Sequence, residues 1–128
     1  MGDALSRDEL MDRIVLTMPT DARLQGVATL VLGGIGSRLQ LPYERMDDLQ
    51  LAVLSVLAAT GDETVTIEVG AGEASIEVAV GPLADGSTTD LALSRVLDRL
   101  VDSVEAADRE GRPWLSLRIE RAPTAAAQ

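Results

Sequence analysis

Five amino acids are missing from this chain of 128 residues: cysteine, histidine, lysine, asparagine and phenylalanine. Without cysteine no disulfide can form, and without cysteine and histidine the usual ligands of zinc and other transition metals are absent. The missing histidine excludes catalytic triads with an imidazole base, and the missing lysine excludes Schiff-base enzymes and the Walker-type phosphate loop. We therefore expect neither a metal nor a cofactor in this protein.

Basic residues are scarce as well, and all eleven of them are arginine. Twenty-one acidic residues give the chain a net charge of −10, and no basic cluster segregates the two signs of charge. Such a chain repels phosphate backbones and anionic lipid, so nucleic acid and membrane surfaces are poor partners. The N-terminal residues are polar, without a signal peptide, and no apolar run approaches the ~20 residues of a membrane span. We expect a soluble, cytoplasmic protein.

Aromatic residues make up only 2% of the chain, so its core must be aliphatic. Hydrophobic residues amount to 46% and charged residues to 25%, a balance typical of globular proteins. The length fits one domain, and neither a linker nor an internal repeat divides it. We expect a single domain over residues 1–128, with a core at about 13–121 and frayed ends at 1–11 and 122–128.

Alternation and helical periodicity predict four strands and three helices. The strands are expected at residues 12–19, 63–69, 74–80 and 114–120, and the helices at about 20–39, 43–60 and 90–107. The third helix has the clearest apolar stripe, formed by Leu93, Val96, Leu97, Leu100, Val101 and Val104. Each strand is apolar on one face only, so the helices should cover a single face of the sheet. The predicted fold class is α+β: a two-layer sandwich with a four-stranded mixed sheet, three helices on one face and the order β-α-α-β-β-α-β.

Two groups of residues invite a catalytic interpretation. The glycines of "GGIG", residues 33–36, could cradle a phosphate, but they lie inside a helical pattern and no lysine follows, which favours close packing against a neighbouring helix or a local bend. Carboxylate pairs occur at residues 47 and 48, 62 and 63, and 98 and 102. An acid–base pair needs a sheltered carboxylate, whereas these positions lie on polar faces or in turns. We interpret both groups as structural.

A single tryptophan, Trp114, begins the last predicted strand. Alternation places Leu115 and every second residue after it under the helices, and it places Trp114, Ser116 and Arg118 on the face that the helices leave open. The tryptophan either shields a sheet edge or contacts a partner, because an aromatic residue beside an arginine is a frequent anchor of interfaces. Trp114, Ser116 and Arg118 are therefore the candidate partner-binding residues.

Several local patterns follow one another in a characteristic order over residues 14–69. A strand ends in proline, a helix ends in "RLQLP", an acidic "MDDLQLAV" leads into the central helix, and the strand "DETVTIEV" follows. In order and spacing the chain resembles the anti-sigma-factor serine kinases of bacterial partner-switching systems, which belong to the ATPase superfamily of histidine kinases and gyrase. The resemblance covers about residues 13–121. It implies the sandwich fold, and a sigma factor or an antagonist-like protein as the partner.

The same resemblance implies where a nucleotide would bind. The family's central helix carries a Glu and, four residues on, an Asn that holds the magnesium bridging the ATP phosphates. These two positions fall on Ser55 and Ala59, and Gly81 replaces the Asp of the family's adenine-binding Asp-x-Gly-x-Gly motif. The central helix is uncharged over residues 51–60, and Ser55 is expected to bond the carbonyl one turn back. The resemblance thus predicts a degenerate ATP site without catalytic residues.

The favoured hypothesis is a non-catalytic, protein-binding regulator that resembles an anti-sigma factor and sequesters its partner without ATP. Two alternatives stay open. The first is a dimeric scaffold domain outside sigma regulation, in which the partner is a second copy of the chain. The second is an ATP-dependent serine kinase with a rebuilt site.

Overall fold

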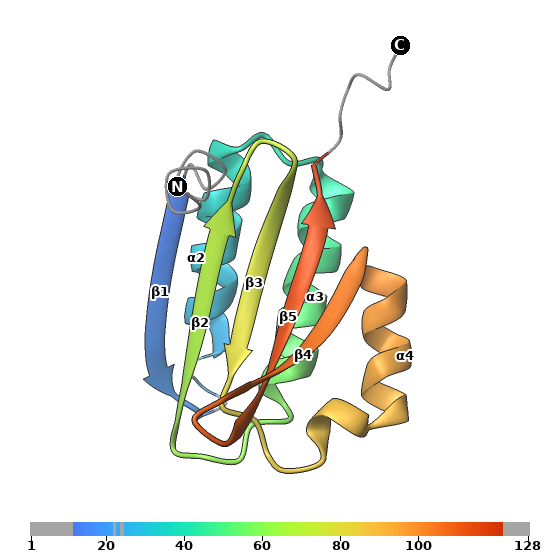
Figure 1. Ribbon diagram of the computed structural model, residues 1–128. Coiled ribbons are helices and arrows are strands. Elements are labelled where there is room, and N and C mark those ends of the chain that lie inside the picture. Colours follow the sequence, from blue (N-terminus) through green and yellow to red (C-terminus); the bar gives the residue numbers. More distant parts are fainter. Residues whose placement is uncertain (1–11, 22, 24, 122–128) are drawn as a thin grey trace, which may run out of the picture.

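A computed structural model describes residues 12–121 except residues 22 and 24 (Figure 1). The predicted frayed ends, 1–11 and 122–128, lie outside the described residues. The elements follow in the order β1 (Asp12–Pro19), α2 (Gln25–Arg38), α3 (Tyr43–Leu57), β2 (Thr64–Ala71), β3 (Ser75–Gly81), η2 (Ser87–Thr89), α4 (Leu91–Leu100), β4 (Ser103–Arg109) and β5 (Arg112–Glu120).

The strands form one five-stranded sheet with the order β1-β2-β3-β5-β4, and every neighbouring pair is antiparallel. Helices α2, α3 and α4 lie on one side of this sheet, and the other side is left open (Figure 1). The α+β class with three helices is confirmed. The prediction of a four-stranded mixed sheet is wrong, because a fifth strand, β4, forms at one edge and no pair of strands is parallel.

The sequence pattern places the residues of β4 in the third helix, which it predicts to run to about residue 107. Helix α4 instead ends at Leu100, and Val101 has extended backbone angles (φ −127°, ψ 166°). The carboxylate of Asp102 then accepts hydrogen bonds from the Glu120 main chain at 2.7 Å and from the Arg45 side chain. These contacts hold the chain beside β5, so Val104 continues the apolar stripe as a strand residue opposite Leu117.

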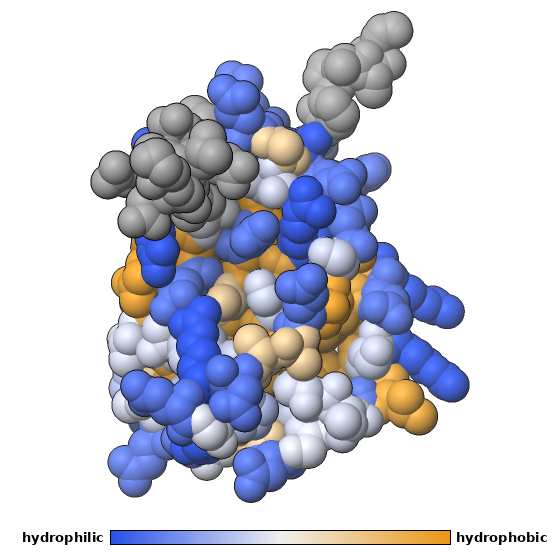
Figure 2. All heavy atoms as spheres, viewed as in Figure 1, coloured by the Kyte–Doolittle hydropathy of each residue, from blue (hydrophilic) through white to orange (hydrophobic). Residues whose placement is uncertain are grey.

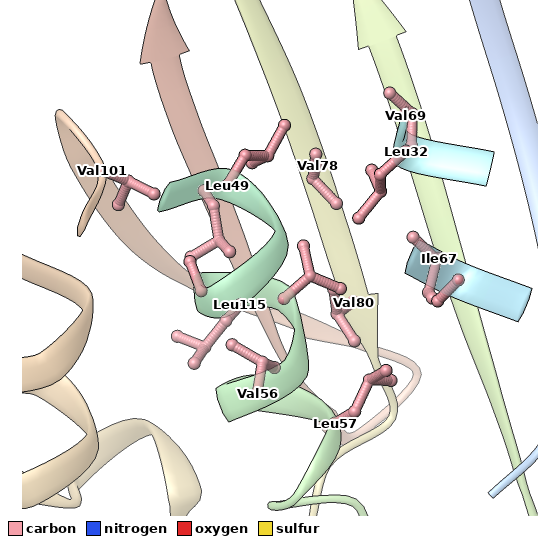
Figure 3. Close-up of a cluster of buried hydrophobic side chains, with 14 of the residues drawn as sticks. Leu32, Leu49, Val56, Leu57, Ile67, Val69, Val78, Val80, Val101 and Leu115 are labelled. Atoms are coloured by element: carbon pink, nitrogen blue, oxygen red, sulfur yellow. The ribbon is translucent and has the colours of Figure 1, made fainter. Parts of the chain in front are cut away.

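The core between the sheet and the helices is aliphatic, as the scarcity of aromatic residues predicted. Its centre is α3, whose Leu49, Val56 and Leu57 point toward β3 and β5 (Figure 3). Among the described residues no buried side chain is charged or polar. The burial of these aliphatic side chains is the main stabilising contribution to the fold.

The glycines of α2 include one close helix contact, as predicted for "GGIG". A Cβ atom built on Gly36 would overlap the side chain of Met46 in α3. Gly34, in contrast, has nothing within 4 Å of the same position. In the described part of the chain, no helix is both long enough and apolar enough to span a membrane.

Candidate functional site

One candidate site is a shallow hollow of about 310 Å³ beside the C-terminal end of α3. It contains two of the three positions at which the resemblance implied a nucleotide site, Ser55 and Ala59. The remaining lining residues come from the turn after α3, the loop before α4 and the start of α4: Ala58, Thr60, Ala84, Ser87, Asp90 and Leu93. The structure therefore brings Ser55 and Ala59 together at an open surface.

The polar groups of this hollow are used to hold the main chain. The Ser55 hydroxyl donates to the Leu51 carbonyl at 2.9 Å, which confirms the bond predicted one turn back along the helix. The main-chain oxygen of Ala59 accepts from the Ala84 N–H at 2.9 Å and from the Ser87 hydroxyl at 3.3 Å. Ser55 thus bonds within α3, and Ala59 connects the end of this helix to the loop before α4.

The hollow also lacks the groups that bind a nucleotide phosphate. The N-terminus of α4 opens onto it, and such N-termini attract anions through their free N–H groups. Here the Asp90 carboxylate accepts from the N–H groups of Ala92 and Leu93 at 2.9 and 3.2 Å, so a negative charge already occupies this position. No arginine lines the hollow, and the described residues contain no group of three His, Cys, Asp or Glu that could hold a metal ion.

The third position, Gly81, lies elsewhere. It ends β3, and a Cβ atom built on it would overlap the ring of Trp114 on the open side of the sheet. The structure thus does not bring Gly81 together with Ser55 and Ala59. In this chain the glycine permits close contact with an aromatic ring, a frequent reason for glycine inside a strand.

The second candidate site is the open face of the sheet. It is formed by alternate residues of all five strands, and Figure 2 looks onto it and shows hydrophilic side chains over most of it. We use "open face" for the following set: Arg13, Val15, Thr17, Thr66, Glu68, Gly70, Glu77, Ala79, Gly81, Ser103, Glu105, Ala107, Arg109, Trp114, Ser116 and Arg118. No described helix covers this face (Figure 1).

A network of charges crosses the open face. Arg109 lies over the ring of Trp114, with its Cζ atom 4.0 Å from the ring centroid, and its Nη1 donates to Glu68 of β2 at 3.0 Å. Glu68 also lies 3.8 Å from the guanidinium of Arg13 in β1. Arg109 therefore connects the β4–β5 hairpin to strand β2, which lies beyond β3 in the same sheet. Beside this network lies a hollow of about 150 Å³.

The small residues of the open face form that hollow. Gly70, Ala79 and Ser116 lie between the larger side chains of Arg13 and Arg109. A second hollow, of about 220 Å³, continues toward β4 and is lined by Glu77, Ser103, Glu105, Ser116 and Arg118. Ser116 lines both hollows, so it lies near the middle of a polar depression.

Trp114 belongs to the open face, as alternation predicted, and it is almost fully buried there. Its side chain is 9% exposed because it packs on Gly81 and is covered by Arg109. Ser116 and Arg118 are accessible: Ser116 is half-buried, and the Arg118 side chain is 43% exposed and 4.0 Å from Glu120. Gly81 was the sequence signal for the buried ring, since a glycine inside a strand often marks a close approach.

In each of the three carboxylate pairs, one member is paired with an arginine: Asp48 and Asp102 with Arg45, and Asp62 with Arg112. Arg112 donates two hydrogen bonds to Asp62, at 2.8 and 2.9 Å, and this contact lowers the pKa of the Asp62 carboxyl. An aspartate with a lowered pKa stays ionised and is a poor general acid. Asp98 and Asp102 do not share a helix face, because Asp102 lies beyond α4 and binds Arg45.

A scan against models of known protein families finds no match for this chain, and a search of curated proteins finds none either. Two candidate sites of the structure bear on function. One is a hollow whose polar groups are already satisfied, and the other is a polar, accessible sheet face.

Proposed function

We propose that this protein is a non-catalytic, protein-binding regulator that resembles an anti-sigma factor and sequesters its partner without ATP. The observation that carries the proposal is the chemistry of the hollow beside α3. Ser55 and Ala59 stand where the related enzymes use a Glu and an Asn, and the Asp90 carboxylate occupies the N–H groups of α4 that would otherwise attract phosphate. Because these groups do not favour a nucleotide, the protein would act by binding another protein.

The order of elements supports the resemblance on which this proposal rests. A strand, two helices, a hairpin and a further helix follow one another as in the anti-sigma kinases, and all three helices lie on one side of the sheet. In the active members of that family, the Asn on the central helix holds magnesium and the nucleotide phosphates. This chain has no asparagine at all, which disfavours the alternative of a serine kinase with a rebuilt site.

The open face offers the surface for such a partner. It combines accessible arginine and glutamate side chains with a depression around Ser116, and no described element covers it. Three arginines, Arg13, Arg109 and Arg118, lie on it, so it is far less acidic than the chain as a whole. A sigma factor or an antagonist-like protein would contact this mixed-charge face. Electrostatic complementarity of this kind favours specificity and rapid association.

Partner capture with matched variants tests the proposal. We expect the protein, immobilised in an extract of its source cells without added nucleotide, to capture one protein in stoichiometric amount. Ser116→Arg should reduce that capture at least ~10-fold, because an arginine would fill the depression; a tenfold loss corresponds to about 1.4 kcal/mol. Ser94→Arg, which adds the same charge on an exposed position of α4, is the control and should capture normally.

Mass spectrometry identifies the captured protein, and the regulator assignment requires it to be a sigma factor or an antagonist of one. If Ser116→Arg and the control captured the partner equally well, the partner would not bind at the open face. Capture that depends on added ATP and magnesium would contradict the claim that sequestration needs no nucleotide.

A further inference from the structure

The two edges of the sheet differ in how they are protected. Within the described part of the chain, strands β1 and β4 each pair with one neighbour only, so each has a row of main-chain groups that no described strand pairs with. Strand β4 carries Glu105, Asp108 and Arg109, and such charged residues discourage pairing with another chain. Strand β1 has no charged residue over 14–18, the sequence "IVLTM". The β1 edge is therefore less protected by charge than the β4 edge.

The hydrogen bonds of β1 show which of its groups point outward. The Thr20 N–H donates to the Glu63 carbonyl at 2.9 Å, which continues the β1–β2 register by one residue. In an antiparallel pair, hydrogen-bonded and non-hydrogen-bonded residues alternate. The even-numbered residues of β1 thus bond to β2, and the main-chain groups at the free edge are those of the odd-numbered residues: Arg13, Val15 and Thr17.

Pro19 agrees with this assignment. It is odd-numbered, so its nitrogen faces the free edge, where proline costs the sheet no hydrogen bond. The same residue limits how a second strand can pair. If two β1 strands paired antiparallel with Thr17 opposite Thr17, Pro19 of each would lie opposite Val15 of the other, and each copy would lose one N–H donor. If they pair with Val15 opposite Val15, Pro19 lies beyond the residues that form the hydrogen bonds.

We propose that β1 pairs antiparallel with β1 of a second copy of this chain, with Val15 opposite Val15 on the two-fold axis. Arg13 of each copy then lies opposite Thr17 of the other. All outward N–H groups of this segment find acceptors, three from each copy and six in all. The two sheets join into one continuous sheet across the axis.

The side chains along this seam favour a second copy over a strand of another protein. Val15 is 54% exposed, and symmetry brings the two Val15 side chains together on the open face. On the helix side, Ile14 lies opposite Leu16 of the other copy, and both are only partly buried against the core at present. Ile14 and Leu16 would form a non-hydrogen-bonded pair, in which the Cα atoms of opposite residues are closest, at about 4.5 Å. Pairing would cover all of these apolar groups.

Charge also permits this pairing in a chain of net charge −10. Arg13 is 3.8 Å from Glu68 of its own copy, so each copy brings one arginine and one glutamate near the seam. Thr17, the residue opposite Arg13, is uncharged and bonds the Thr66 hydroxyl at 2.9 Å. Residues of like charge therefore do not lie opposite each other where the two β1 strands pair. Over much of the remaining surface of this acidic chain, two copies would bring like charges together.

Opposite charges at Val15 test the two-fold arrangement. We expect sedimentation equilibrium to show a dimer for the unaltered chain, and Val15→Glu and Val15→Arg each to weaken it at least tenfold, because identical charges then face each other. An equimolar mixture of the two variants should restore the dimer. Ser103→Glu and Ser103→Arg, on the opposite edge strand β4, are the controls and should dimerise normally. Circular dichroism melting verifies that the variants are folded.

Hydrogen exchange locates the pairing residue by residue. The amides of Arg13, Val15 and Thr17 should be protected in the concentrated protein and should exchange rapidly on dilution or in Val15→Glu, while those of Ile14 and Leu16 stay protected throughout. A chain that is monomeric at about 1 mM, or single Val15 variants that dimerise normally, would overturn the proposal. A dimer whose Val15 amide exchanges rapidly would do the same. None of these outcomes bears on partner capture at Ser116.

Discussion

Trp114→Ala is expected to lower the free energy of unfolding by about 3–5 kcal/mol. Trp114 is 9% exposed, and its ring rests on Gly81 and is covered by the Arg109 guanidinium, so its removal leaves an unfilled space between Arg109 and the open face of the sheet. Urea denaturation followed by far-ultraviolet circular dichroism measures the change, since the chain has no other tryptophan to report by fluorescence.

Trp114→Phe is the matched control. It keeps an aromatic ring on Gly81 and under Arg109, so it should lose much less stability than the alanine variant. A Trp114 ring that contacted only a partner would be nearly neutral for the stability of the isolated domain. A loss below about 1 kcal/mol in Trp114→Ala would show that the ring is not packed in solution, because truncation of a buried Trp costs several times more.

Gly81→Ala is expected to destabilise the fold by about 1–3 kcal/mol, the usual cost of overpacking. A Cβ atom at this position overlaps the Trp114 ring, which is rigid and held from the other side by Arg109. The two residues are in contact, so their effects should not add. In a Trp114→Ala background, the same Gly81→Ala change should cost close to nothing, and chemical denaturation of the four proteins gives the coupling.

Gly34→Ala is the control for the glycine change. Gly34 lies in α2 with nothing within 4 Å of the new Cβ position, so alanine should stabilise the protein by up to ~1 kcal/mol through helix propensity. If Gly81→Ala has the same effect in both backgrounds, the close contact with Trp114 is not the cause of the loss.

Most elements of this fold could be predicted from the sequence because their patterns are strong. The hairpin of β2 and β3 alternates over its whole length, and α3 follows a proline with a long apolar surface. Strand β4 could not be predicted in the same way. It is exposed on both faces, so "SVEAADR" shows no alternation, and Val101 and Val104 happen to continue the helical spacing of α4. The strand exists because Asp102 and the β5 ladder hold the chain extended.

The candidate sites were predictable to different degrees. The bond of the Ser55 hydroxyl is local and was predicted, and the distribution of Trp114, Ser116 and Arg118 to one face follows from alternation alone. The burial of Trp114 was not predicted, since it depends on Gly81 from β3 and Arg109 from β4. Alternation along a strand does not show such contacts between distant residues, although a glycine inside a strand often marks a close approach.

Titration calorimetry with ATP and magnesium tests the central claim most directly, namely that this protein acts without a nucleotide. The expected result is no measurable binding, because the hollow beside α3 contains no arginine and the Asp90 carboxylate already occupies the N-terminus of α4. A magnesium-dependent dissociation constant in the micromolar range, about −8 kcal/mol of binding free energy, would contradict it.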